Sequence, residues 1–183
     1  GYLDYSDGTP HWRQPKGQRK LIELRDEHLW SLDYEGPPDW LERSFEHLAA
    51  HTRAVTPGTF VFILSDFLPL LPESAWLAAL QHRWDIAPVV IQDPTWERSF
   101  PVVSGVVLPL RDARSGRIVH VRLTKKEAEA RRAANAARTE ALLEMFRRLD
   151  VDPILVSSSE RGEVLEPFLV WASLRRTRRV VGA

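Results

Sequence analysis

Hydroxyl and carboxylate side chains follow two apolar runs of the sequence, and these residues are the best suited to chemistry. Ser65 and Asp66 come directly after the run 60–64, and Asp93 and Glu97 come after a second run. In open parallel sheets, ligands bind outside the carboxyl ends of the strands, and gathered carboxylates suit a hard cation such as Mg²⁺. Helix capping and the binding of loop amides explain the same carboxylates equally. The residues alone leave both roles open.

Other arrangements that could carry chemistry are weak or absent in this sequence. His47 and His51 are four residues apart, which places both on one helix face, but no glutamate of a metal motif and no third ligand accompanies them. We therefore interpret them as surface histidines. The sequence has no cysteine, no glycine-rich phosphate loop, no dinucleotide fingerprint and no Gly-x-Ser-x-Gly elbow. Thiol chemistry is excluded, and the common nucleotide-binding and serine-hydrolase motifs are missing.

Charge is unevenly distributed along the chain. Residues 1–110 contain 9 Lys/Arg and 15 Asp/Glu, a net charge of −6, whereas residues 111–183 contain 16 and 10, a net charge of +6. Near the C-terminus we interpret four arginines as a solvated helix end that complements the helix dipole: Arg175, Arg176, Arg178 and Arg179. No aromatic residues are interleaved to form a nucleic-acid face, so we predict no nucleic-acid partner. No apolar run reaches the roughly 20 residues that span a bilayer, so we predict no membrane span.

The first half of the sequence predicts a hairpin, two helices and a buried strand. Two aromatic runs within 2–14 flank an Asp-Gly turn, which is typical of a hairpin at a sheet edge. Helical spacing follows over 18–32, and Asp39 is the expected N-cap of a second helix, with Glu42 completing a capping box. The run 60–65 is rich in aromatic and β-branched residues and predicts a strand buried on both faces.

The second half alternates helices with strands. It predicts a helix over 73–83 with Trp76, Leu77 and Leu80 on one face, a buried strand over 86–92, and a hairpin with arms 105–111 and 117–123. Thr124 and Glu127 form a capping box that opens a long helix, with an inward stripe of Ala130, Ala134, Ala137, Ala141, Met145 and Leu149. A strand over 153–156 precedes a last helix, whose expected inward residues are Leu165, Phe168, Leu169 and Ala172.

This alternation of strands and helices indicates an α/β fold. The strands near 60–65, 86–92 and 153–156 are expected to lie parallel and adjacent, with the 2–14 hairpin as an antiparallel edge. The length of 183 residues suits one domain.

Several motifs taken together give the chain a family resemblance. Leu64-Ser65-Asp66-Phe67 after a strand resembles the fourth strand of a von Willebrand factor A domain. The order of Tyr2–Tyr5, Pro15-Lys16-Gly17-Gln18-Arg19, Ile63–Phe67, Asp93-Pro94-x-x-Glu97, the Leu110–Gly116 hairpin and the Ala/Arg-rich helix resembles the domain of unknown function 58 family. The resemblance implies a Rossmann-like, mostly parallel sheet flanked by helices. It also implies that 1–183 is one such domain, N-terminally incomplete and lacking the first strand.

In this family, a metal-ion-dependent adhesion site lies at the carboxyl rim, and Asp66 is the one ligand that carries over. The family's Asp-x-Ser-x-Ser motif would precede Gly1, and prolines stand at Gly36-Pro37-Pro38-Asp39, where a threonine ligand is expected. One carboxylate holds Mg²⁺ poorly. We therefore expect a degenerate site that binds Mg²⁺ weakly or not at all, and no other cofactor.

The resemblance implies a non-catalytic interaction module, a bacterial partner of MoxR-type AAA ATPases. The expected location is the cytoplasm, with a membrane tether through parts outside this chain. We expect the partner to dock on the rim through Ser65, Phe67, Leu68, Asp93, Trp96 and Glu97. The alternative is a Mg²⁺-dependent hydrolase, which requires Asp66, Asp93 and Glu97 to converge.

Overall fold

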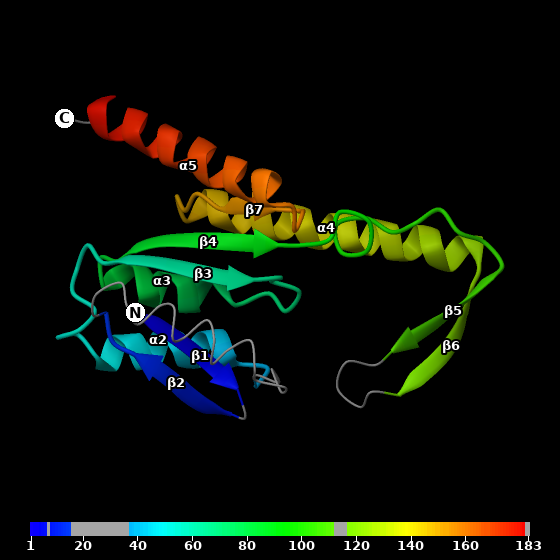
Figure 1. The fold of residues 1–183 in the computed structure, drawn as a ribbon, viewed down its shortest axis with the longest axis horizontal. Coiled ribbons are helices and arrows are strands. Elements are labelled where there is room, and N and C mark those ends of the chain that lie inside the picture. The colour runs from blue at the N-terminus through cyan, green and yellow to red at the C-terminus, as the bar shows by residue number, and fades with distance from the viewer. Residues whose placement is uncertain (7, 16–36, 112–116, 182–183) are drawn as a thin grey trace. The chain divides into compact units, whose positions relative to one another are not determined.

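The computed structural model describes residues 1–6, 8–15, 37–111 and 117–181. The chain divides into two compact units (Figure 1): one comprises residues 1–60 and 71–85, and the other comprises residues 61–70 and 86–183. The helix predicted over 18–32 lies outside the described residues.

The hairpin predicted over 2–14 is present in the first unit. Strands β1 (Tyr2–Ser6) and β2 (Thr9–Arg13) pair antiparallel. Gly8 precedes β2 with a φ of +72°, a conformation that a residue with a Cβ rarely adopts. The two strands form a sheet of their own in the described part of the chain, so the prediction that they extend the parallel sheet was wrong.

The hairpin packs on helix α2 (Trp40–Ala50) instead. The Tyr5 hydroxyl donates to the carbonyl oxygen of Arg43 at 3.2 Å. The Trp12 ring contacts the rings of His47 and His51, with centroids 5.4 and 5.9 Å apart. Both histidines are only partly exposed, so the interpretation as surface residues is corrected: they form part of the contact with the hairpin.

Helix α2 buries Leu41, Phe45 and Leu48, as its spacing predicts. The capping box expected at its start is not formed. Asp39 makes no capping bond with its side chain, because its carboxylate accepts a hydrogen bond from Arg43 Nε at 2.9 Å.

Helix α3 (Glu73–Gln81) completes the described part of the first unit. Its fully buried Trp76 meets Phe45 edge-on, with ring centroids 5.5 Å apart. Leu77, which was predicted on the same inward face, is exposed, and Ala79 is buried in its place.

The second unit is built on a parallel sheet. Strands β3 (Phe60–Ser65), β4 (Asp85–Ile91) and β7 (Ile154–Val156) lie in the order β3-β4-β7, and Val89 of β4 is opposite Ile154 of β7 (Figure 1). The α/β class and the parallel, adjacent strands are therefore confirmed. The first residues of β3 and β4 belong to the first unit, so the chain passes between the units within these strands. A single domain over 1–183 stays a prediction.

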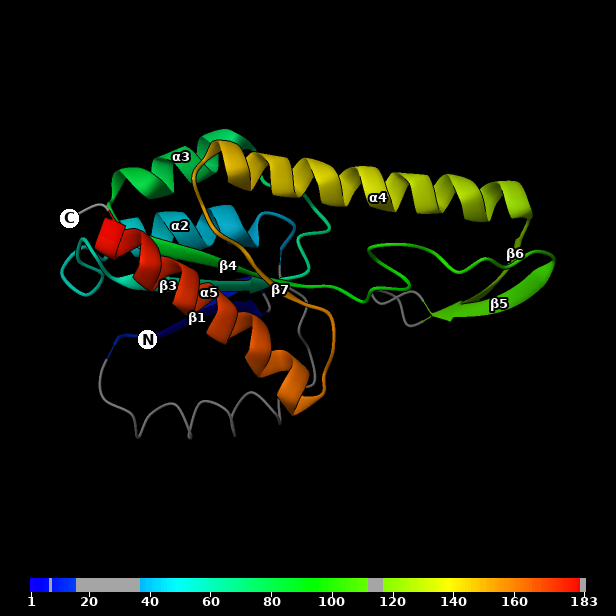
Figure 2. The same cartoon turned by 90° about the horizontal axis from the view of Figure 1, so that it is seen from above.

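Helices α4 (Lys125–Arg148) and α5 (Arg161–Val181) lie on opposite faces of this sheet (Figure 2). From α5, three partly buried side chains pack against Val89, Ile154 and Val156; they are Val164, Phe168 and Trp171. From α4, the fully buried Phe146 meets Phe67 edge-on, with ring centroids 5.7 Å apart. A sheet covered on both faces requires apolar residues on both sides of its central strand, and β4 has them.

Strand β3 differs from the prediction of burial on both faces. Ile63 is buried, but Phe62 and Leu64 are 45 % and 61 % exposed. The reason is that β3 is the outer strand and α5 packs mainly over β4 and β7. Helix α5 contacts β3 only at Phe62 among the ring contacts described, where the Phe62 ring meets Phe168 and Trp171.

Strands β5 (Val106–Arg111) and β6 (Ile118–Leu123) form the second predicted hairpin. The capping box of Thr124 and Glu127 follows it and is present in full, with the Thr124 amide donating to Glu127 at 2.8 Å. The hairpin packs on the start of α4 through one buried cluster, which consists of Phe100, Leu123 and Ala128.

The inward faces of the last two helices were predicted incorrectly in part. In α4, the alanines of the predicted stripe are exposed, and the buried residues are Ala128, Asn135, Leu142, Met145 and Phe146. In α5, Leu165 and Leu169 are exposed, although Phe168 packs on the sheet as expected. Apolar residues lie on several faces of these helices, so their spacing alone does not identify the face that is buried. None of the described helices is long and apolar enough to cross a membrane.

Candidate functional site

The turn after β3 is held by two of the residues that sequence analysis assigns to a site. Ser65 Oγ accepts a hydrogen bond from the Phe67 amide, and Asp66 Oδ1 accepts one from the Leu68 amide, both at 3.0 Å. Side chains that bind an amide two residues ahead replace a backbone turn. Phe67 accordingly lies at a φ of 50°, in the left-handed region that bulky residues rarely occupy.

This turn directs Phe67 inward. Its ring is buried against Phe146, and Leu68 beside it is partly buried. Phe67 therefore belongs to the core of the second unit and does not present its ring to a partner. Ser65 and Asp66 serve first to shape the backbone.

The loop after β4 (residues 92–100) is organised by its own polar side chains. Gln92 Nε2 donates to the carbonyl oxygen of Asp66 at 2.6 Å and so joins the ends of β3 and β4. Asp93 Oδ1 accepts from the amides of Thr95 and Trp96, at 2.7 and 2.9 Å. Glu97 Oε2 accepts from the Asp93 amide at 2.7 Å. The sequence allowed these carboxylates either to bind a cation or to bind loop amides. In the structure, Asp93 and Glu97 bind loop amides.

The three rim carboxylates are the candidate ligands of a Mg²⁺ ion. Asp66, Asp93 and Glu97 each already bind a backbone amide. Within the described ranges, no three His, Asp or Glu residues are grouped so that they could hold a metal ion. The hydrolase alternative requires such a convergence, and this arrangement gives it no support.

Three polar side chains of α4 fix the backbone of loop 92–100. Arg132 Nε donates to the carbonyl oxygen of Phe100 at 3.0 Å, and Arg138 Nη2 donates to that of Glu97 at 2.6 Å. Between them, the buried Asn135 donates through Nδ2 to the carbonyl oxygens of Trp96, at 3.0 Å, and Ser99. Sequence analysis missed these three residues. Their spacing of three residues, which gives a polar stripe on an alanine-rich helix, is the signal that indicates them.

Trp96 is the exposed aromatic of this loop. Its side chain is 46 % exposed, and one edge of its ring packs on the buried Phe100, with ring centroids 5.5 Å apart. Because its amide is bound by Asp93 and its carbonyl oxygen by Asn135, the backbone at Trp96 is fixed on both sides. The site is therefore a half-exposed tryptophan on an ordered loop, with Asp93 and Glu97 in the same loop.

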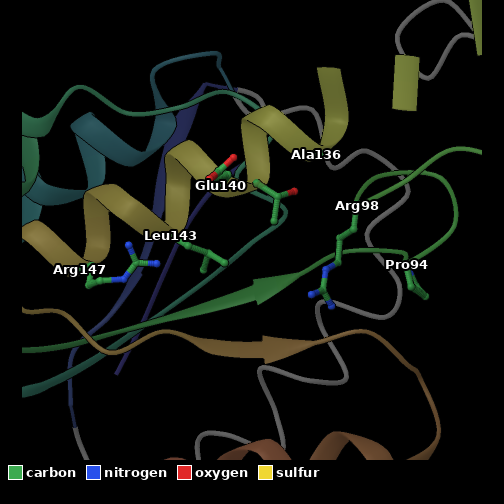
Figure 3. A pocket seen from close by; sticks show the side chains of 7 residues that line it. Pro94, Arg98, Ala136, Glu140, Leu143 and Arg147 are labelled. Carbon is green, nitrogen blue, oxygen red and sulfur yellow. The ribbon is translucent and has the colours of Figure 1, made fainter. Parts of the chain in front are cut away.

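A cleft of about 510 Å³ lies between this loop and α4 (Figure 3). Its walls include Pro94 and Arg98 from the loop, with Ala136, Thr139, Leu143 and Arg147 from the helix. Arg147 pairs with Glu144, whereas Arg98 has no ion pair in the part of the chain described here. Figure 3 shows Arg98 extending toward the end of β4. Glu140 of α4 also lines the cleft, so Arg98 shares it with a carboxylate beside loop 92–100.

No protein-family model, curated protein or solved structure matches the chain.

Proposed function

We propose that the chain is a non-catalytic protein-interaction module, and that loop 92–100 is its docking surface. We further propose that its fold is of the von Willebrand factor A-like kind and that its partner is a MoxR-type AAA ATPase in the bacterial cytoplasm. Its metal-ion-dependent adhesion site is then degenerate, and Asp66 holds a turn in place of an ion. These finer assignments rest on the family resemblance of the sequence.

The observation that carries the docking surface is the fixed, half-exposed Trp96. A tryptophan on a prearranged backbone supplies a large contact area at low entropic cost, which is why tryptophan is common among interface hot spots. Asp93 and Glu97 add polar groups around it, as at the rim of an interface. The parallel sheet covered by helices on both faces supplies the rigid scaffold on which binding loops are usually carried.

Replacing Trp96 tests this docking surface. Trp96→Ala should weaken binding of the cognate MoxR-type ATPase by more than about 1 kcal/mol, or roughly fivefold in Kd, because an anchor is removed. Calorimetric titration of the ATPase with the two chains measures the effect. The melting temperature should change little, since about half of the side chain is already in water.

Val102→Ala is a matched control, because Val102 is apolar, follows the same loop and is 84 % exposed. It should leave affinity unchanged. An unchanged affinity for Trp96→Ala together with a markedly lower melting temperature would show that Trp96 serves the core, and the docking surface would have to lie elsewhere.

A further inference from the structure

A second groove runs along the outer side of strand β7. Its volume is about 500 Å³, and it is lined by residues 152–155 and Ser157 on the strand side. Ile154 and Leu155 point to opposite faces of the sheet, yet both line the groove. The groove therefore follows the edge of the strand rather than one face of the sheet.

The backbone of β7 presents hydrogen-bonding groups along this edge. Val156 accepts from the Gln92 amide through its carbonyl oxygen, so Val156 faces β4. Because successive residues of a strand point their amide and carbonyl groups to alternate sides, those of Leu155 point away from β4. In the described part of the chain, no strand pairs with this side of β7. Pro153 also faces outward and has no amide hydrogen to leave unpaired.

The helix side of the groove is apolar and exposed. Val170 and Leu174 lie one turn apart on α5 and are 53 % and 60 % exposed. Trp171 is fixed between them and the strand, because its indole N–H donates to the carbonyl oxygen of Asp152 at 3.1 Å. An apolar wall beside an unpaired strand edge matches a segment that adds to the sheet and covers this wall with alternate side chains.

The ionisable groups lining the groove are all acidic. Asp152, Glu163 and Glu166 contribute carboxylates, and no Lys or Arg is among the lining residues. Glu163 and Glu166 form no ion pair within the described residues. Arg175 lies over the Trp171 ring, 4.9 Å from its centroid. Although Arg175 borders the groove, the ionisable residues of its lining are carboxylates, and this lining complements a basic segment.

We propose that this groove binds an extended, basic segment of a protein partner, in which lysine or arginine alternates with apolar residues. The segment pairs with the Leu155 backbone as an added strand, places its apolar side chains on Val170 and Leu174, and places its cations beside Glu163 and Glu166. Trp96 does not line the groove, so this inference is independent of the docking surface on loop 92–100.

The test is a titration of the whole chain with a capped six-residue peptide that alternates valine with lysine. Nuclear magnetic resonance should show shifts of the Leu155 and Ser157 amides and of the Trp171 indole N–H. Short peptides of this kind bind weakly, with a Kd of about 0.1–1 mM at low salt. The same peptide with glutamate in place of lysine should bind at least tenfold more weakly. Raising the salt concentration should weaken the lysine peptide.

Two variants change exposed side chains of the groove. Glu163→Gln with Glu166→Gln should weaken the lysine peptide about tenfold or more, and Leu174→Gln should weaken it by removing part of the exposed apolar wall. Glu129→Gln with Glu140→Gln changes two exposed carboxylates of α4 and should have no effect. Equal binding of the lysine and glutamate peptides would overturn the proposal. So would self-association of the free chain that the Glu163 and Glu166 variant abolishes, because the groove would then hold a second copy.

Discussion

His47 and His51 stack on each other in α2, with ring centroids 4.3 Å apart and Trp12 against both rings. The Nδ1 of His51 lies 2.7 Å from the carbonyl oxygen of His47, which fixes its ring when that nitrogen carries the proton. Burial lowers the pKa of His47 below its usual 6.5, and the neighbouring His51 lowers the pKa further. The contact between hairpin and helix is therefore best formed with a neutral His47 ring.

Stability should consequently fall in mild acid. The folded chain protonates His47 at a lower pH than the unfolded chain does, so the unfolded state binds more protons as pH falls below about 6.5. Thermal melts should show a lower melting temperature at pH 5.5 than at pH 7.5. His47→Gln should reduce this difference, whereas His120→Gln, at an exposed position of β6, should not. Equal pH dependence in all three chains would contradict the role of His47.

At the same scale, the polar residues of the rim show which part of the site the sequence can predict. The position of the candidate site after β3 and β4 was predictable, because the apolar runs of these strands give way to polar residues at Ser65 and Gln92. The directions of the side chains did not follow. Phe67 turns inward from a left-handed conformation, and the amide bonds made by Ser65 and Asp66 accompany this turn. Asp93 is more easily interpreted, since an aspartate before proline commonly binds the amides that follow it.

Among the elements, α4 has two roles, since its polar side chains bind loop 92–100 and its apolar side chains pack on the sheet. Asn135 is central to the first role because one amide group serves two carbonyl oxygens. Removing a donor from buried acceptors costs about 1–3 kcal/mol. The loop should therefore loosen when this side chain is shortened, even though alanine favours the helix.

Asn135→Ala should speed amide hydrogen exchange over residues 96–100 and lower stability by about 1–3 kcal/mol. Exchange followed by mass spectrometry, with denaturant unfolding, gives both quantities. Ala134→Asn places an asparagine on the exposed face of the same helix and should leave exchange in the loop unchanged. If Asn135→Ala exchanges no faster than the unmodified chain, the loop is ordered by other contacts.

Most elements were predictable because their signals are local. The capping box at Thr124 predicted the start of α4. The first hairpin followed from aromatic runs around an Asp-Gly turn, and the second from alternating residues around a turn. The buried face of α4 was not predictable in the same way. Its alanines lie on several faces, so they do not mark the buried one. Asn135 is buried because it binds carbonyl oxygens of loop 92–100, and the sequence of the helix does not show that those partners are near. Contacts between distant segments, not local propensity, decided this face.

For the whole molecule, apolar surface remains exposed at both edges of the parallel sheet. At β7 it lines the groove described above. At β3, Phe62 and Leu64 share one face, and Phe62 contacts α5, where Leu165 and Leu169 are also exposed. An outer strand with exposed apolar side chains favours association between chains.

Leu64→Lys should therefore reduce concentration-dependent self-association, because a lysine on an outer strand opposes pairing with another chain. Sedimentation velocity at several concentrations measures the change. Since Leu64 is largely exposed, the melting temperature should stay within a few degrees. Val102→Lys is the control, because Val102 is more exposed than Leu64 and lies outside the described strands. Self-association that persists unchanged in Leu64→Lys would show that β3 is not responsible.

The bonds from α4 to loop 92–100 have a consequence for how such a chain can diverge. Arg132, Asn135 and Arg138 bind carbonyl oxygens, and every amino acid carries one. These bonds therefore do not depend on which side chain stands at Trp96, an exposed position of the loop that makes none of the side-chain bonds to its backbone. Mutations at Trp96 can alter what the loop recognises while the helix continues to impose the same trace, so new specificities can arise here without a new fold.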